Sequence, residues 1–268
     1  NNMKEIINSQ FDKNLTKNLL QLSESCMSEA LKKEKNEIFV KPDNTIVTDT
    51  DKNIHNIIFD RLSYLYPEIP IISEEGTFNN DSFLNKIYWL IDPLDGTTSF
   101  VKGGTGYTIN IALIKNGYPC LGLIASPPSK TIWYGSINEA FVFKNSIKRK
   151  LEVRPLDKTN ITIVTSKNLD HATKKFIERF VGAKINSFSS SIKFCKLAEG
   201  NADLYPRLES ISKWDIAAGD AILRASGGKL FNDKGQEYKY NTASSKSGKF
   251  FEISTSLLLY DCNLQQNI

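Results

Sequence analysis

The stretch Tyr88–Phe100, YWLIDPLDGTTSF, carries the strongest indication of the fold. It opens with the apolar run Trp89–Ile91, which is typical of a strand covered on both faces of its sheet. Proline cannot donate a hydrogen bond to a neighbouring strand, so we expect the strand to stop at Asp92-Pro93. Asp92 and Asp95 would then lie at the carboxyl end of the strand, on either side of a tight turn.

Small and hydroxyl-bearing residues, Gly96 to Ser99, follow the second aspartate. Such residues suit the start of a helix, whose first N–H groups have no partner within the helix. Carboxylates able to hold a metal would therefore lie beside N–H groups able to hold a phosphate. The alternative is a plain strand–turn–helix joint whose aspartates serve only as cap and turn residues. This stretch alone does not decide between the two.

The composition limits the class of protein. The chain has 268 residues, 40% of them hydrophobic and 24% charged, which is ordinary for a soluble globular protein. Its net charge of +4 is too small an excess to predict nucleic-acid binding, but it suits a small anionic substrate. No apolar run approaches the ~20 residues needed to span a bilayer, and no charged-then-apolar leader is visible. We therefore expect a cytoplasmic protein, free or held at the inner face of the cell membrane.

The cysteines point to a reducing compartment. They are widely spread and form no C-x-x-C pair, so we expect buried free thiols rather than disulfides. The four residues are Cys26, Cys120, Cys195 and Cys262.

We expect two halves that meet near residue 155, covering residues 1–155 and 156–268. In the first half a periodic apolar stripe predicts a helix from Lys4 to about Lys35, and a second helix begins at Asp51. Short strands follow, and Asn116-Gly117 predicts a hairpin turn between two of them. The first half should therefore be helices packed on an antiparallel-rich sheet. Its expected strands cover residues 70–72, 88–91, 107–115, 120–125, 131–134 and 140–143.

The second half alternates more regularly between strands and helices. Gly227-Gly228 predicts the end of its last helix. The expected strands cover residues 161–165, 183–186, 202–205, 229–231 and 250–254. The expected helices cover residues 169–181, 190–199 and 215–226.

Three acidic groups stand at strand ends or helix starts, and they are Glu74 with Glu75, Asp92 with Asp95, and Asp215. Hard cations such as Mg²⁺ prefer oxygen ligands, whereas two histidines and no clustered cysteines argue against zinc. Carboxylates on several segments can hold two ions about 4 Å apart, a spacing that flanks a phosphate ester. The sequence therefore favours metal-assisted phosphate chemistry.

Four motifs in order carry a resemblance to a known family: VTDTD at 47–51, SEEG at 73–76, IDPLDGTTSF at 91–100 and WDIAAGDAI at 214–222. Together they resemble the lithium-sensitive, magnesium-dependent phosphomonoesterase superfamily that includes inositol monophosphatase and fructose-1,6-bisphosphatase. The stretch SSSIKFCKLAEGNADLYPR at 189–207 is most similar to the bacterial CysQ type, the 3′(2′),5′-bisphosphate nucleotidases. The resemblance runs from about Leu31 to the last strand. It implies an α/β (α+β layered) fold, an α-β-α-β-α sandwich.

The resemblance implies a site for two Mg²⁺ ions, with a third, looser ion reached by Glu74 through water. It assigns Glu74, Asp92 and the backbone carbonyl of Leu94 to the first ion. It assigns Asp92, Asp95 and Asp215 to the second. The substrate phosphate would lie against these same groups.

The resemblance also implies the groups that act on water and phosphate. The hydroxyl of Thr97, tied to Asp51, would bind the attacking water, and the pair would accept its proton. The N–H groups of Gly96 and Thr97 would hold phosphate oxygens. For Asp51 the alternative role is a charge at a helix start.

Three residues of the second half, Ser190, Lys193 and Arg207, match positions that contact the nucleotide and its second phosphate in the CysQ branch. Without the resemblance they would be a helix cap, a solvated lysine and a surface ion pair. Asn168 replaces a histidine common in that branch, which puts a base or sugar contact in doubt. Thr98-Ser99 replaces a Lys-Glu pair and is closer to inositol monophosphatases.

The leading functional prediction is an enzyme that hydrolyses the 3′-phosphate of adenosine 3′,5′-bisphosphate to AMP, and that also acts on 3′-phosphoadenylyl sulfate, within sulfur assimilation. The alternatives are an inositol monophosphatase and an inactive relative that binds nucleotides or anions. An inactive relative would be expected to lose the water-activating pair, yet Asp51 and Thr97 are both present. Lithium inhibition is implied by the resemblance, and both a monomer and a homodimer remain open.

Overall fold

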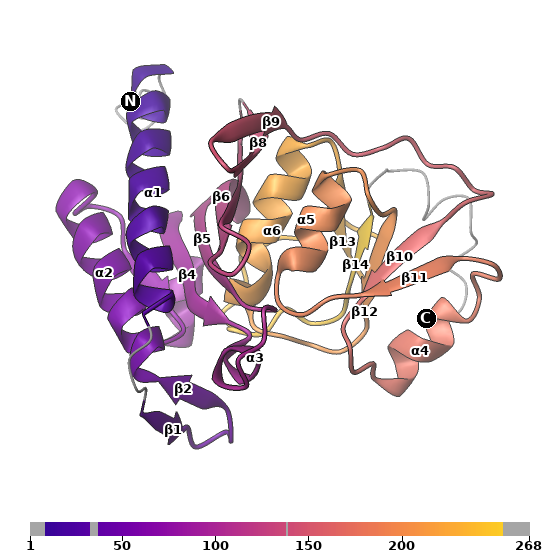
Figure 1. Ribbon diagram of the computed structural model, residues 1–268, viewed down its shortest axis with the longest axis horizontal. Helices are drawn as coiled ribbons and strands as arrows, with labels where there is room; N and C mark the ends of the chain where they lie inside the picture. Colours follow the sequence, from indigo (N-terminus) through magenta and orange to yellow (C-terminus); the bar gives the residue numbers. More distant parts are fainter. Residues whose placement is uncertain (1–8, 33–36, 138, 254–268) are drawn as a thin grey trace.

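The computed structural model describes residues 9–32, 37–137 and 139–253, which form five stacked layers (Figure 1). Two helices cover one face of a seven-stranded sheet, and two further helices lie between that sheet and a five-stranded one. A short helix packs on the far face of the smaller sheet. The predicted α-β-α-β-α sandwich is therefore confirmed.

The larger sheet is antiparallel except where its first two strands run parallel. Its strands, in spatial order, are β3 (Ile71–Ser73), β4 (Ile87–Asp95), β5 (Thr108–Lys115), β6 (Tyr118–Ser126), β7 (Thr131–Ser136), β8 (Ala140–Lys144) and β9 (Ile147–Lys150). The hairpin predicted at Asn116-Gly117 joins β5 to β6. Side chains alternate between the two faces, so Trp89 and Ile91 enter the core on one side and Leu90 enters the core on the other.

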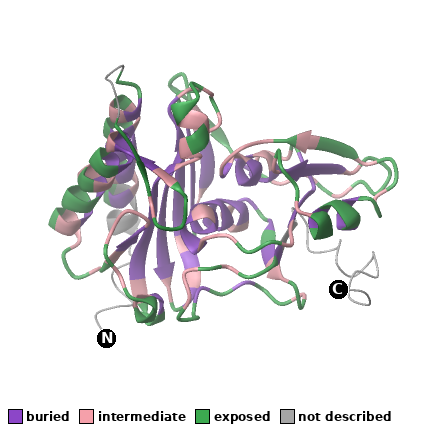
Figure 2. Cartoon of the chain, turned by 90° about the horizontal axis from the view of Figure 1, so that it is seen from below, coloured by how far each residue is buried: buried purple, intermediate pink, exposed green. Residues whose placement is uncertain are grey.

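The outer face of this sheet is covered by α1 (Ser9–Ala30) and α2 (Asp49–Leu65). The apolar stripe predicted for the first helix is buried at Leu15, Leu19 and Leu22, while the solvent side of both helices is exposed (Figure 2). The helix ends at Ala30 rather than near Lys35. The expected start before Ser9 lies outside the described residues.

The smaller sheet has the order β11-β10-β12-β14-β13. Its strands are β10 (Thr162–Thr165), β11 (Lys184–Ser187), β12 (Leu204–Arg207), β13 (Lys229–Asn232) and β14 (Phe250–Ile253). The helices α5 (Ile192–Ala198) and α6 (Lys213–Ala225) fill the space between the sheets, and α4 (His171–Ile177) covers the far face. One hydrophobic core spans both halves of the chain. The boundary near residue 155 falls in the link between β9 and β10, and the division into two domains stays a prediction.

Two sequence-based expectations about strands differ from the structure. The strand does not stop at Asp92-Pro93, because β4 continues to Asp95 and its pairing with β5 shifts register between Asp92 and Asp95. Pro93 lies in that irregularity, where its missing N–H is not needed.

The second difference lies in residues 40–51, VKPDNTIVTDTD, where the sequence predicts only a turn that leads out of the first helix and the structure contains a hairpin. The segment before α2 forms β1 (Ile38–Val40) and β2 (Ile46–Thr48), two antiparallel strands near the lower end of α2 (Figure 1). Asp43 stabilises the connecting turn, since its carboxylate accepts a hydrogen bond from the backbone N–H of Thr45 at 3.1 Å.

Within residues 9–32, 37–137 and 139–253, no helix combines the length and the apolar character that crossing a bilayer requires. Cys26, Cys120 and Cys195 form no disulfide, as predicted, although Cys120 is only half-buried. Cys262 lies outside the described part of the chain.

Close packing between β6 and α6 makes Gly122 a sensitive position. A Cβ atom there would lie 2.2 Å from the carbonyl oxygen of Ala218 on α6. We expect Gly122→Ala to lower the free energy of unfolding by about 3 kcal/mol, since the backbone of the helix must move. Urea denaturation would measure this.

Gly182 offers a matched control. Its φ is +82° and a Cβ there would meet no atom within 4 Å. Gly182→Ala should cost only about 1 kcal/mol, the strain of a left-handed alanine. Equal losses in the two variants would show that the contact between β6 and α6 is not tight.

Candidate active site

Three carboxylates from separate parts of the chain meet at one edge of the larger sheet. Glu74 follows β3, Asp92 lies in β4, and Asp215 lies in the first turn of α6. One carboxylate oxygen from each residue lies within 4.8 Å of the other two. The structure thus brings together three of the carboxylates predicted to bind metal.

The local backbone structure positions each of these three residues. β3 and β4 are parallel, and the N–H of Glu74 donates to the carbonyl of Ile91 at 3.1 Å, so the end of β3 lies beside Asp92 of β4. Asp215 belongs to a capping box, in which its carboxylate accepts a hydrogen bond from the N–H of Ser212. The end of β3, Asp92 of β4 and the start of α6 therefore face one small volume.

Asp95 lies beside this group rather than within it. Its charge is close enough to raise the pKa of Asp215, after the larger effect of burial. Burial also raises the pKa of Asp95, and the nearby ammonium of Lys193 is the first of several groups that oppose the shift. Asp95 thus stands between the three grouped carboxylates and the basic side of the site.

The charges of the site favour a cation. Burial raises the pKa of Asp92 well above its usual range, and the negative charges of Glu74, Asp95 and Asp215 raise it further. Like charges held this close in a buried site are unfavourable unless a positive charge joins them. Because every grouped donor is a carboxylate oxygen, the residues fit a hard divalent cation such as Mg²⁺.

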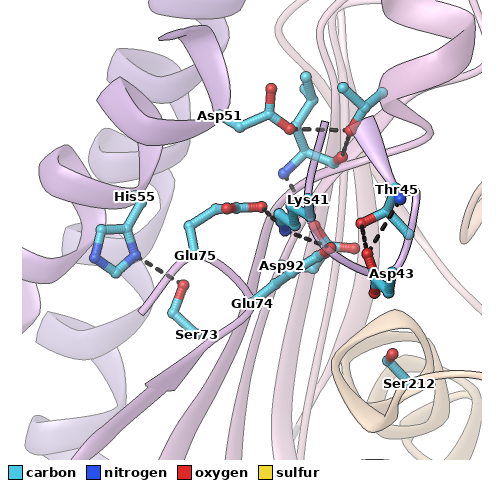
Figure 3. A network of polar contacts seen from close by, with 12 residues as sticks. Lys41, Asp43, Thr45, Asp51, His55, Ser73, Glu74, Glu75, Asp92 and Ser212 are labelled. Atoms are coloured by element: carbon cyan, nitrogen blue, oxygen red, sulfur yellow. Dashed lines mark hydrogen bonds and ion pairs between the residues drawn. The ribbon is translucent and has the colours of Figure 1, made fainter. Parts of the chain in front are cut away.

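A lysine from the β1–β2 hairpin reaches the rim of this site (Figure 3). The ammonium of Lys41 lies 3.2 Å from a carboxylate oxygen of Glu74 and 2.6 Å from one of Glu75. Adjacent glutamates at a strand end repel one another, so the sequence predicts that this pair needs water, a basic partner or a cation. The sequence does not indicate that Lys41 is this partner, because residues 40–51 predict only a turn and not the hairpin that carries Lys41.

Asp51 and Thr97 are joined across 46 positions of sequence. The hydroxyl of Thr97 lies 2.9 Å from Oδ1 of Asp51 and 3.0 Å from the carbonyl oxygen of Leu94. The other oxygen of Asp51 accepts hydrogen bonds from the backbone N–H and the hydroxyl of Thr48, the N-cap of α2. Asp51 therefore both caps a helix and faces Thr97, so the two roles considered for it are compatible.

Only glycine fits at position 96, in the turn after Asp95. Gly96 has a φ of +92°, and a Cβ there would lie 2.5 Å from the carbonyl oxygen of Gly106. It is followed by the short helix α3 (Thr97–Val101). This close approach fixes where the Thr97 hydroxyl lies relative to Asp51.

The predicted substrate residues line one cavity of about 190 Å³ with Asp95 and Asp215. Lys193 is buried, and its ammonium donates to the carbonyls of Ser190 and Phe188, so it is not a solvated lysine. Ser190 is not a helix cap, since Ser191 takes that position. All three predicted residues, Ser190, Lys193 and Arg207, meet at this cavity.

Arg207 does form the ion pair considered for it, with Glu209 at 3.5 Å, while its guanidinium also donates to the hydroxyl of Ser166 at 3.0 Å. Ser166 lines the cavity, a role the sequence did not indicate. Asn168 is exposed, and the cavity is lined by Ser166 in its place. The second half therefore contributes two cationic side chains, Lys193 and Arg207, and two serine hydroxyls to this cavity.

Comparison with known proteins agrees with this geometry. Residues 6–251 match the family model described as "Inositol monophosphatase family". The 3′(2′),5′-bisphosphate nucleotidase CysQ of Buchnera aphidicola subsp. Acyrthosiphon pisum is 39% identical over 209 residues, 77% of this chain and 78% of that protein.

Solved structures agree as well. The crystal structure of CysQ from Bacteroides thetaiotaomicron, a bacterial member of the inositol monophosphatase family, is 26% identical. It superposes with a TM-score of 0.78 over 92% of this chain and 98% of that one. An IMPase/NADP phosphatase complexed with Mg²⁺ and phosphate has the same fold, with 20% identity and a TM-score of 0.77 over 97% of this chain and 96% of that one. With the carboxylates, the Asp51–Thr97 pair and the layered fold all in place, the chain belongs to the inositol monophosphatase family.

Proposed function

We propose that the protein is a Mg²⁺-dependent 3′(2′),5′-bisphosphate nucleotidase, which removes the 3′-phosphate of adenosine 3′,5′-bisphosphate and leaves AMP. The observation that carries the proposal is the cavity in which Ser190, Lys193 and Arg207 face Asp95 and Asp215. A basic end beside an acidic end suits a substrate with two phosphates, one held by metal and one by side chains. The kinship with CysQ proteins supports the same substrate class.

The proposed metal ligands are those named from the sequence. Glu74, Asp92 and the carbonyl of Leu94 would hold one ion, and Asp92, Asp95 and Asp215 a second. Bound divalent ions would make the attacking water more acidic and neutralise charge on the leaving oxygen. Whether Glu74 reaches a third ion through water depends on its ion pair with Lys41.

In the proposed reaction, the Thr97 hydroxyl and Asp51 orient the water and take its proton. The water donates to the oxygen of Thr97, and the Thr97 proton moves to Asp51, whose buried carboxyl has a raised pKa. A new P–O bond forms as the ester P–O bond to the ribose breaks, and the ribose oxygen keeps the electron pair of that bond and takes up a proton from solvent. The N–H groups of Gly96 and Thr97 hold the phosphate oxygens in this scheme.

A substrate panel tests the proposal directly. We expect adenosine 3′,5′-bisphosphate to have the highest kcat/KM when phosphate release is measured with Mg²⁺. The panel would include 3′-phosphoadenylyl sulfate, inositol 1-phosphate and fructose 1,6-bisphosphate, with LiCl as the inhibitor. Faster turnover of inositol 1-phosphate would favour the alternative activity, which Thr98-Ser99 suggests. Binding of the nucleotide without turnover would favour an inactive relative.

The second phosphate provides a sharper prediction. Arg207→Gln should raise KM for adenosine 3′,5′-bisphosphate by about 10- to 100-fold, the worth of a hydrogen bond between charged groups. It should leave KM for inositol 1-phosphate nearly unchanged, since that substrate has no second phosphate. Arg149→Gln, which removes an exposed cation of β9, is the control for overall charge. Equal effects of Arg207→Gln on both substrates would contradict the assignment.

A cytoplasmic location and the choice between monomer and homodimer stay predictions. Gel filtration of the purified chain would decide the second.

A further inference from the structure

A second cavity, of about 730 Å³, lies between α5 and the strands β7, β8 and β9 of the larger sheet (Figure 1). The first cavity is the one lined by Ser190, Lys193 and Arg207. Among the residues that the structure describes, none lines both cavities, although α5 contributes to each. A volume of this size is typical of sites that bind small molecules. The side chains in its walls therefore indicate which ligand it would accept.

The strand pairing builds one wall of the second cavity. Trp133 of β7 is paired with Val142 of β8, and Val142 is paired with Arg149 of β9, so these three side chains form a row on one face of the sheet. Lys144 lies two residues beyond Val142 on β8 and therefore shares that face. All four residues line the cavity. Two cations thus stand beside the apolar surface of Trp133 and Val142.

The start of α5 supplies the opposite wall. Phe188, which precedes the helix, and Ile192, its first residue, are both half-buried and line the cavity. Together with Trp133 they give an apolar lining with two aromatic rings. Aromatic side chains stack on the flat faces of nucleic-acid bases whatever the sequence. This part of the cavity suits a planar base.

The charges of the second cavity favour an anion. Among its described lining residues the only acid is Glu199, whose oxygens lie 2.7 Å from Nε1 of Trp133 and 3.1 Å from the ammonium of Lys196. Lys144 and Arg149 are exposed and form no ion pair with any described residue. A phosphate monoester carries about two negative charges at neutral pH, which these two cations would balance.

We propose that the second cavity binds a nucleoside monophosphate, with its base against Trp133 and Phe188 and its phosphate between Lys144 and Arg149. The hydroxyl of Thr105, at the rim, would face the ribose. This site goes beyond the proposed function, since it uses none of the carboxylates and needs no metal. A nucleoside monophosphate is also the class of product that the proposed reaction releases.

Calorimetric titration with AMP in EDTA tests the site, because EDTA removes the divalent ions that would help the first cavity to hold a phosphate. Lys144→Gln/Arg149→Gln should raise the Kd for AMP by about 10- to 100-fold, the worth of hydrogen bonds between charged groups. Adenosine has no phosphate. It should bind the wild type more weakly than AMP does, and its Kd should be the same in the double variant.

The outward face of the same edge strand offers a matched control. Lys148 pairs with Glu139 at 2.8 Å and lies over the ring of Phe141, and Lys150 is paired with Phe141 in the sheet. Lys148→Gln/Lys150→Gln therefore removes two positive charges from β9 without touching the cavity. The Kd for AMP should stay within about twofold of the wild-type value. Thermal melting of both double variants would show that they are folded.

Four results would overturn the site. The first is a Kd for AMP that is unchanged in Lys144→Gln/Arg149→Gln, or that rises equally in the control. The second is loss of AMP binding in Arg207→Gln, which would assign the nucleotide to the first cavity.

The other two results concern larger ligands. A short single-stranded RNA that binds more tightly than AMP would make this face a nucleic-acid surface. Wild-type protein that elutes from gel filtration as a dimer, with Lys144→Gln/Arg149→Gln as a monomer, would assign the face to a second copy of the chain. None of the four bears on the proposed reaction, which the substrate panel tests separately.

Discussion

Asp92→Asn is expected to lower kcat by on the order of 10³-fold while the metal-free protein stays at least as stable as the wild type. Asp92 is the carboxylate shared by both proposed ions, and only 1% of its surface is exposed. An amide of the same shape loses the charge that the ions require. Phosphate release at saturating Mg²⁺ would measure the change in rate.

The stability of this variant should depend on pH in a defined direction. Burial raises the pKa of Asp92 in the metal-free protein above its ordinary value. The stability that such a carboxyl contributes is present at low pH and is lost as the pH rises through the raised pKa. Asparagine does not titrate, so the variant should melt at a higher temperature than wild type in EDTA near neutral pH, and the difference should shrink in acid.

A second buried aspartate separates metal binding from folding. Asp220 on α6 has no exposed side-chain surface, and its carboxylate pairs with the guanidinium of Arg224 at 2.6 Å and accepts from the Tyr240 hydroxyl. Asp220→Asn breaks a buried ion pair and should lower the free energy of unfolding by about 3 kcal/mol, with kcat retained in the folded fraction. If Asp92→Asn behaved like Asp220→Asn, Asp92 would be a structural residue rather than a metal ligand.

The layered fold could be predicted because local patterns agree with it. The apolar alternation around Tyr107 to Lys115 and the turn at Asn116-Gly117 specify β5 and β6 without reference to distant residues. The apolar stripe of the first helix likewise specifies which face is buried. Element ends were less predictable. The ends of helices and strands depend on pairing with distant residues. For example, the hydrogen-bonded pairing between β4 and β5 resumes beyond Pro93.

Some residues of the site could not be predicted from the sequence, because tertiary contacts bring them there. Acidic residues at strand ends can be recognised in the sequence as candidate ligands, since ligand sites in α/β folds lie at the carboxyl ends of strands. Lys41 cannot be recognised in this way, because nothing near it in the sequence shows that its ammonium pairs with Glu74 and Glu75. Asn110 lies in an alternating strand as an ordinary buried position, and its hydrogen bond with Ser191 forms only when the start of α5 reaches β5.

Thr97→Val is expected to lower kcat by about 10³-fold, the usual worth of a positioned proton acceptor, with KM and the affinity for Mg²⁺ nearly unchanged. Valine has the shape of threonine and lacks only the hydroxyl, which lies 2.9 Å from Asp51 and 3.0 Å from the carbonyl oxygen of Leu94. Thr97 is a cleaner probe than Asp51, because Asp51 also accepts the hydrogen bonds that cap α2. Steady-state kinetics with adenosine 3′,5′-bisphosphate would measure the effect.

The adjacent residue supplies the control, since Thr98 belongs to the same short helix and is exposed. Thr98→Val makes the identical chemical change one position away and should leave kcat within about twofold, as surface substitutions usually do. A Thr97→Val enzyme that kept more than a tenth of wild-type kcat would mean that the water is oriented by another group. If both variants lost activity equally, the effect would come from the conformation of α3 and not from the Thr97 hydroxyl.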